Sequence, residues 1–273
     1  MNKERFSRQS FLGLGAEWII EQATIGVVGL GGGGSHIVQQ LAHIGFTNFV
    51  IYDPDRVEES NLNRLVGATR DDAQYQRTKV TVAERLINGL NANANICSFK
   101  ARWQDNPGAL RECDLVFGCL DRLQDRSELE VCARRFVLPY IDIGLGVRRV
   151  GAEPPRMAGQ IVLSMPGAAC FRCLGFLNER DLAEEAAQYG DAGPRPQVVW
   201  ANGVLAATAV GVAVDLLTDW TTATRGPVYL SYDGNAGTLS PHPRLRYAPT
   251  NACEHFIAEE VGDPNFLLVP TIT

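Results

Sequence analysis

The chain has 273 residues, of which 45% are hydrophobic, and a formal net charge of −6. This length supports one large α/β domain, and the negative charge argues against a nucleic-acid partner, because binding a polyanion needs a basic surface. Residues 1–13 are polar and interrupted by charge, so we expect no signal peptide. Seven cysteines, an odd number, favour a reducing cytoplasm over a disulfide framework.

Predicted strands and helices alternate through residues 1–144. In chain order these are the strand Thr24–Gly29, a helix from about Gly34 to Gly45, the strand Asn48–Tyr52, the helix Lys79–Leu90, the strands Asn95–Phe99 and Asp114–Cys119, the helix Gln124–Phe136 and the strand Tyr140–Ile143. The first strand is a short apolar run, as expected for a strand buried on both faces. The alternation predicts an α/β fold of the Rossmann-like class, with a doubly wound, mostly parallel sheet.

The pattern changes beyond Gly144, where we expect a partly antiparallel C-terminal region. Strands are predicted at Gln160–Met165 and Val228–Tyr232, with a helix at Val198–Leu217 between them. The most apolar part of that helix has about 14 residues, fewer than the 18 to 20 that span a bilayer, so we expect a buried helix and no membrane partner. Asn178–Asn202 is expected to be a long functional loop.

A glycine-rich turn follows the first predicted strand. Gly29, Gly31 and Gly34 satisfy the pattern G-x-G-x-x-G, in which the backbone turns sharply and the helix amino terminus meets a phosphate. Asp53 closes the second strand, where a carboxylate accepts hydrogen bonds from ribose hydroxyls. By itself this pattern fits NAD, FAD or ATP equally well.

The next segment separates these nucleotides. Arg64 and Lys79 would place two cations near the phosphates, which hydride transfer does not need. A site that cleaves between the α- and β-phosphates needs them, because negative charge develops on the phosphorus centre and on the departing pyrophosphate. Asp121, after the strand DLVFGC, is suited to hold Mg²⁺ between phosphate oxygens.

The sequence resembles the superfamily that contains ThiF, MoeB and the ubiquitin-activating enzymes. The resemblance is carried by GLGGGGS from Gly29, DPDRVEESNLNR from Asp53, then Lys79 and Asp121, and covers roughly residues 5–253. It implies a single adenylation domain over residues 1–273, with a nucleotide-binding half (1–144) and a substrate-binding and dimer half (145–273). In this superfamily the C-terminal carboxylate of a glycine-tailed protein attacks the ATP α-phosphate, giving an acyl-adenylate and pyrophosphate.

The resemblance also implies roles for individual residues and for partners. The nucleotide site would contain Gly29, Gly31, Gly32, Gly34, the ribose ligand Asp53, the phosphate contacts Asn61, Arg64 and Lys79, the magnesium ligand Asp121, and Asp55 as a ligand or as a loop-ordering residue. Arg8 resembles an arginine that members insert into the neighbouring subunit's site, which implies a homodimer. The implied partner is a small ubiquitin-like or sulfur-carrier protein with a C-terminal glycine, acting in the cytoplasm.

Two features depart from the family pattern. Cys170 and Cys173 match half of a four-cysteine zinc site, but the second half offers Cys253 and His255, with Phe256 at the position of the fourth cysteine. Both a Cys₃His zinc site and a decayed site with buried cysteines fit this pattern.

The second departure concerns the thiol. The loop before the late apolar helix contains no cysteine, so we expect a downstream partner protein to supply the accepting thiol, with a thioester on Cys253 left open. Cys97, Cys113, Cys119 and Cys132 are expected to be buried, inert thiols. The alternatives are an NAD- or FAD-dependent oxidoreductase and a catalytically silent partner in a heterodimer; the set of Arg64, Lys79 and Asp121 argues against the silent partner.

Overall fold

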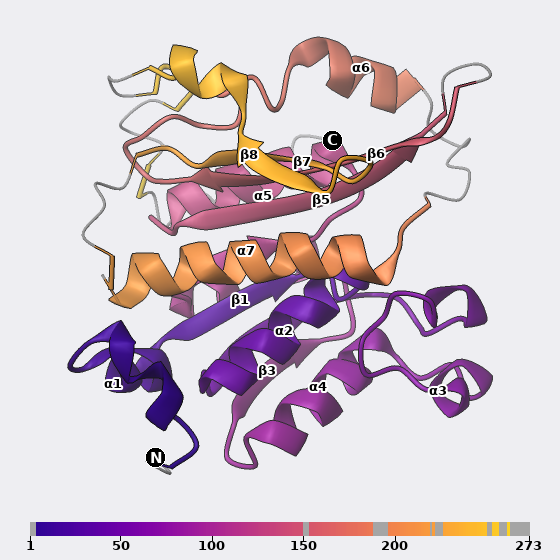
Figure 1. The fold of residues 1–273 in the computed structure, drawn as a ribbon, viewed down its shortest axis with the longest axis vertical. Helices are drawn as coiled ribbons and strands as arrows, with labels where there is room; N and C mark the ends of the chain where they lie inside the picture. Colours follow the sequence, from indigo (N-terminus) through magenta and orange to yellow (C-terminus); the bar gives the residue numbers. More distant parts are fainter. Residues whose placement is uncertain are drawn as a thin grey trace.

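The computed structural model describes residues 4–149, 153–187, 196–218, 220–221, 226–249, 253–256 and 261–262. Its centre is one eight-stranded sheet with the strand order β3-β2-β1-β4-β5-β6-β7-β8 (Figure 1). The strands are β1 (Thr24–Val28), β2 (Asn48–Tyr52), β3 (Asn95–Phe99), β4 (Leu115–Gly118), β5 (Tyr140–Arg148), β6 (Arg156–Ser164), β7 (Tyr229–Asp233) and β8 (Thr238–Pro241). The helices are α1 (Ala16–Gln22), α2 (Gly32–Ile44), α3 (Arg70–Gln74), α4 (Lys79–Leu90), α5 (Leu123–Arg135), α6 (Glu179–Ala187) and α7 (Val199–Thr218), with short 3₁₀ helices between them.

Strands β1 to β5 pair in parallel and form the doubly wound part of the sheet. The central strand β1 is apolar on both sides, because Ile25 and Val27 pack under α2, α4 and α7 whereas Val28 packs under α5. Covering both faces leaves no place for alternating polar residues, which is why the sequence shows a continuous apolar run here. The predicted Rossmann-like α/β class is confirmed.

The C-terminal strands are antiparallel, as predicted. β5 pairs with β6 over nine residue pairs, from Tyr140 opposite Ser164 to Arg148 opposite Arg156. β5 is therefore longer than the predicted strand Tyr140–Ile143: its first half is part of the parallel sheet and its second half extends beyond it as a hairpin.

Helix α7 is long and apolar enough to cross a membrane by length and composition alone. In the structure it lies along the sheet beside α2 (Figure 1), and Ala201, Leu205, Ala209 and Ala213 are fully buried in the main core. Small residues on this face let two helices approach closely. The prediction of a buried helix is confirmed at this packing interface.

The prediction of one long loop at Asn178–Asn202 is wrong in two places. Residues Glu179–Ala187 form α6, and α7 already begins at Val199. Asn178 starts α6 by accepting a hydrogen bond from the Asp181 backbone N–H at 2.9 Å. This stretch of alanine and glutamate is a good helix former despite its polarity, so composition alone concealed the helix. Residues 188–195 lie outside the described part of the chain.

Candidate nucleotide site and metal centre

A cavity of about 420 Å³ opens at the carboxyl ends of the parallel strands. It lies beside β1 and β4, where the strand order reverses, which is where open α/β sheets bind ligands. This volume is within the range of small-molecule sites. Predicted nucleotide-site residues that line it are Gly29, Gly31, Gly32, Asp53, Asp55, Arg64, Lys79 and Asp121.

The glycines of the turn serve two purposes. Gly29 has a φ of +90°, and a Cβ there would lie 2.5 Å from the Cys119 carbonyl oxygen. A Cβ at Gly34 would collide with the Gly29 carbonyl oxygen, so this glycine permits close packing of α2 on β1 and is not among the described cavity-lining residues. Gly31 borders the cavity, and a Cβ there would meet no described atom within 4 Å. The cavity therefore reaches bare backbone where α2 begins.

Asp53 is buried and orders the turn beside the cavity. Its Oδ2 accepts a hydrogen bond from the Leu30 backbone N–H at 2.7 Å, and its Oδ1 accepts one from the Asp55 N–H at 2.8 Å. Burial raises the pKa of this carboxyl, and the Lys79 ammonium, 3.7 Å away, opposes that shift. These two backbone hydrogen bonds fix the orientation of the Asp53 carboxylate at the edge of the cavity.

Two cations meet at the same cavity. Lys79 is the first residue of α4, and its Nζ lies 2.6 Å from Asp55 Oδ2. The Arg64 guanidinium donates to the Ser60 carbonyl oxygen at 2.7 Å and to Asn63 Oδ1 at 3.0 Å. Arg64 and Lys79 both line the cavity together with Gly29, Gly31 and Gly32; their contacts to phosphate stay a prediction.

Asp121 also lines the cavity, in the loop that follows β4. Gln197 Nε2 donates to Asp121 Oδ1 at 3.3 Å, and the Gln197 carbonyl accepts from Asn63 Nδ2 at 3.3 Å. Asn202 lies over the glycine turn, where a Cβ at Gly32 would collide with its amide. Gln197 and Asn202 were not predicted as site residues. The sequence pattern that could have indicated them is the presence of polar residues at the start of a very apolar helix. A carboxylate oxygen is the kind of ligand that Mg²⁺ takes in proteins.

A buried charged network lies behind Asp121 and was also missed. The Arg126 guanidinium donates to the Asp142 carboxylate and to the Leu120 carbonyl oxygen, and the Tyr140 hydroxyl donates to Asp142 Oδ1 at 2.9 Å. Burial raises the pKa of Asp142 to about 6, although Arg126 opposes that shift. The sequence pattern that could have indicated this network is an aspartate within the apolar strand YIDIG.

Two predicted site residues lie elsewhere in the structure. Asn61 is mostly buried and accepts a hydrogen bond from the Glu58 N–H at 3.2 Å, which stabilises a 3₁₀ turn. Arg8 is exposed in the 3₁₀ helix Ser7–Leu12, and neither residue is among the described cavity-lining residues. The nearby Arg5 is held in its own chain by the Leu90 carbonyl at 2.6 Å. The roles assigned to Asn61 and Arg8 stay predictions.

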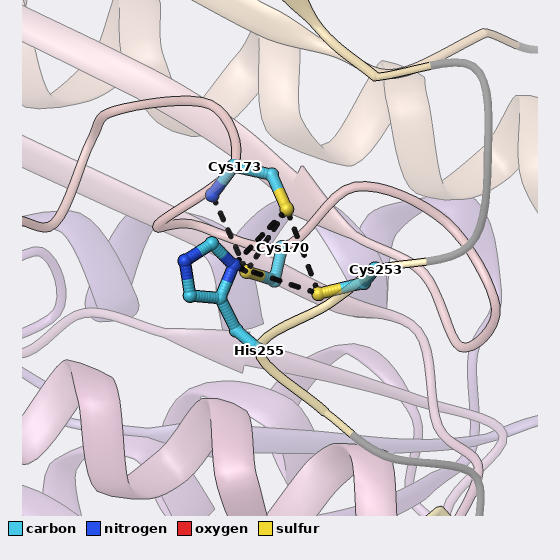
Figure 2. A group of neighbouring side chains, drawn as sticks. All are labelled: Cys170, Cys173, Cys253 and His255. Atoms are coloured by element: carbon cyan, nitrogen blue, oxygen red, sulfur yellow. Dashed lines mark hydrogen bonds between the residues drawn. The ribbon is translucent and has the colours of Figure 1, made fainter.

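Cys170, Cys173, Cys253 and His255 converge on one point (Figure 2). The sulfur–sulfur distances are 3.6 Å for Cys170–Cys173 and 3.5 Å for Cys173–Cys253. His255 Nδ1 lies 3.5, 3.3 and 3.9 Å from the sulfurs of Cys170, Cys173 and Cys253. Zinc–sulfur bonds of about 2.3 Å in a tetrahedron give edges of about 3.8 Å, so the four atoms fit a tetrahedral zinc site.

Buried charges support the loop that carries the first two cysteines. Glu130 accepts a hydrogen bond from the Phe171 N–H at 2.8 Å, and Arg134 donates to the Ala169 carbonyl oxygen at 3.2 Å. The Arg134 guanidinium lies 4.8 Å from the ring centre of Phe256. Phe256, at the position of the expected fourth cysteine, thus packs on an arginine, and His255 faces the sulfurs instead.

Most of the remaining cysteines are buried or half-buried, which makes their thiols unreactive. Burial raises the pKa of Cys113 and of Cys132 to about 12, and it raises the pKa of Cys119, which borders the cavity. Cys97 on β3 is exposed, so its predicted burial is wrong: it lies on the edge strand of the sheet, which has a parallel neighbour on one side only.

The sequence model of the ThiF family matches residues 7–254. Ubiquitin-like modifier-activating enzyme 5 of Dictyostelium discoideum is 28% identical over 172 residues, which cover 57% of this chain and 42% of that protein. Adenylyltransferase and sulfurtransferase uba4 of Aspergillus fumigatus is 28% identical over 218 residues, which cover 75% of this chain and 42% of that protein. The chain thus spans about two fifths of the length of these curated relatives.

Solved structures show the same fold. The crystal structure of E. coli MccB with selenomethionine MccA superposes with a TM-score of 0.74 at 18% identity, covering 93% of this chain and 74% of that chain. The crystal structure of E. coli MccB with ATP superposes with a TM-score of 0.71 over 88% of this chain. The likeness extends through both the parallel and the antiparallel parts of the sheet.

Proposed function

The chain belongs to the ThiF family, and from this premise we propose that it uses ATP to adenylate the C-terminal carboxylate of a small ubiquitin-like or sulfur-carrier protein. One observation carries the proposal: a glycine turn, Arg64, Lys79 and Asp121 line a single cavity. A hydride-transfer site has no use for two cations and a carboxylate around the phosphates. The oxidoreductase alternative is therefore disfavoured, and so is a catalytically silent partner.

The chemistry assigns a task to each group. A carboxylate oxygen of the substrate attacks the α-phosphorus of ATP, the bond to the β-phosphate breaks, and pyrophosphate leaves while an acyl-adenylate forms. Backbone N–H groups at the start of α2 bind phosphate oxygens, and Arg64 and Lys79 neutralise the charge that develops in the transition state. Asp53 positions the ribose. Mg²⁺, held by Asp121 when nucleotide is bound, would shield the phosphate charge.

The relatives support the substrate class. One is named a ubiquitin-like modifier-activating enzyme and another an adenylyltransferase and sulfurtransferase, so both conjugation and sulfur transfer are represented. We propose that the accepting thiol belongs to a downstream protein in the cytoplasm, because burial keeps the thiol nearest the cavity, Cys119, protonated.

Two further parts complete the proposal. Zn²⁺ bound by the Cys₃His cluster would hold the C-terminal segment on the domain, since the cluster does not border the described cavity. A homodimer would bring Arg8 of one protomer to the site of its partner, which accounts for an exposed arginine outside its own cavity. Residues 1–144 would then form the nucleotide half and residues 145–273 the substrate and dimer half.

ATP–pyrophosphate exchange tests the proposed function. The wild-type chain should exchange labelled pyrophosphate into ATP only in the presence of the correct glycine-tailed substrate, whereas Asp121→Ala and Arg64→Ala should be inactive but folded. ATP should also raise the melting temperature, and NAD should not. Exchange that persists in both variants, or protection by NAD alone, contradicts the proposal.

A further inference from the structure

Arg126 connects the loop that carries Asp121 to the centre of the sheet. It lies in the first turn of α5, is 6% exposed and borders the cavity. One terminal nitrogen donates to the carbonyl oxygen of Leu120, the residue before Asp121. The other donates to Asp142 on β5, whose second oxygen accepts from Tyr140. The peptide that precedes Asp121 is therefore linked through the side chains of Arg126 and Asp142 to a central strand.

The sequence leaves room for this network at two glycines. A Cβ at Gly144 would lie 2.7 Å from both terminal nitrogens of Arg126. A Cβ at Gly118 would collide with the Tyr140 hydroxyl group. Neither glycine has a positive φ, so backbone conformation does not require them. The space they leave lets the guanidinium and the phenol reach the Asp142 carboxylate.

Stability is a poor explanation for a charge pair at this depth. Removing both ions from water costs several kcal/mol per ion, which their attraction offsets only with good geometry, and apolar residues of similar volume often stabilise as well or better. Arg126 also borders the cavity, and it donates to the carbonyl oxygen of the residue before a proposed metal ligand. Partners in the outer shell of a metal site orient the ligand and change the affinity for the ion.

We propose that Arg126 is a positioning residue that fixes the Leu120–Asp121 peptide, so that the Asp121 carboxylate holds the Mg²⁺ of bound nucleotide at one place. This inference rests on the proposed function. Asp142 and Tyr140 fix the guanidinium in turn. Arg126→Lys keeps the charge but cannot donate to Leu120 and Asp142 with the same planar fork.

Calorimetric titration of ATP at a series of Mg²⁺ concentrations tests the assignment without relying on turnover. Arg126→Lys should raise the Mg²⁺ concentration that gives half-maximal ATP affinity by about tenfold or more, and leave ATP binding in excess chelator nearly unchanged. Tyr140→Phe, which loses one hydrogen bond, should shift the midpoint in the same direction by about threefold. If Arg126→Lys does not fold, Tyr140→Phe decides the matter.

Arg85→Lys is a matched control. Arg85 donates to the buried carboxylate of Asp72 at 2.8 and 2.6 Å and to the Gly67 carbonyl at 2.7 Å, the same combination of partners, away from the described cavity lining. The Arg85→Lys variant should have a lower melting temperature, but the Mg²⁺ concentration that gives half-maximal ATP affinity should not change. A wild-type chain that binds no ATP overturns the proposed function and this inference with it. Mg²⁺-dependent binding in the wild type with an unshifted midpoint in the folded Arg126 or Tyr140 variant overturns only the positioning role.

Discussion

The ammonium group of Lys79 lies 2.6 Å from the carboxylate of Asp55, and both groups face the cavity. A lysine as the first residue of α4 is opposed by the helix dipole, and this nearby anion explains why it is tolerated. The Lys79 ammonium is therefore oriented at the cavity by a partner whose side chain is 63% exposed.

Lys79→Met should weaken ATP binding by more than about tenfold, because a charge-assisted contact to phosphate is lost from a mostly buried site. Asp55→Asn should change the dissociation constant by less than that, since it removes only the exposed partner of Lys79. Titration calorimetry of both variants measures the difference. Equal losses in the two variants would mean that the ion pair itself, and not the lysine, recognises the nucleotide.

Gly34→Ala should destabilise the chain by about 3 kcal/mol or more, because the new methyl group collides with the Gly29 carbonyl oxygen and backbone must move. Gly31→Ala should change the unfolding free energy by less than about 1 kcal/mol, since its methyl group meets open space, but should weaken ATP binding at the cavity edge. Urea unfolding and nucleotide titration separate the two effects. A fully stable Gly34→Ala protein would contradict the packing role of this glycine.

Cys173→Ser should remove bound metal and lower the melting temperature, because three ligands are left for a tetrahedral ion. Elemental analysis of the wild type should find one zinc ion per chain. The exposed Cys97, changed to serine, provides the matched control and should keep both metal content and stability. A wild-type chain purified without chelators and free of zinc would instead support a decayed site.

In the Asp72→Asn variant, the free energy of unfolding should depend less on pH in the acid range than it does in the wild type. Hydrogen bonds from Arg85, then from Thr69 and Arg77, hold the pKa of the Asp72 carboxyl well below its usual value, although burial opposes them. The stability that Asp72 contributes is therefore present above about pH 4 and is lost as the pH falls further. The variant should be less stable than wild type by about 2 kcal/mol at pH 7, and the difference should shrink towards pH 3.

Urea unfolding at pH 7, 5 and 3 measures this dependence, with the exposed neighbour Asp71→Asn as the control. A difference between variant and wild type that stays constant down to pH 3 would contradict the proposed source of the stability.

The sequence predicted those parts of the fold that depend on local periodicity. The strand Thr24–Val28 and the helix Lys79–Leu90 were located to within a residue, because burial on two faces or on one stripe leaves a repeating apolar signal. Helix α6 was missed because its segment, rich in alanine and glutamate, was interpreted as a loop from its polar composition. The extent of β5 was underestimated because a hairpin beyond the sheet is less apolar than the sheet itself.

Site residues could be predicted where they belong to sequence motifs of fixed spacing. They could not be predicted where the fold brings together residues from separate elements. Gly29, Asp53 and Arg64 follow one another in motifs of fixed spacing, and the structure places them on one cavity. Arg126 and Asp142 belong to different elements, and the reason for each is visible only when α5 packs beside β5. His255 was a proposed substitute for the fourth cysteine, and the structure places its ring nitrogen among the three sulfurs.

The Cys₃His cluster joins positions 80 residues apart, Cys173 and Cys253. With a metal ion bound, the segment between them becomes a closed ring that contains α6, α7, β7 and β8. If α7 detached from the sheet, the metal ion would still hold both ends of this ring together. The detached segment would then gain less conformational entropy, and detachment would cost about 4 kcal/mol more than it would without the ion. The cavity at the glycine turn, which Gln197 and Asn202 of this ring help to line, would therefore depend on an ion bound elsewhere on the domain.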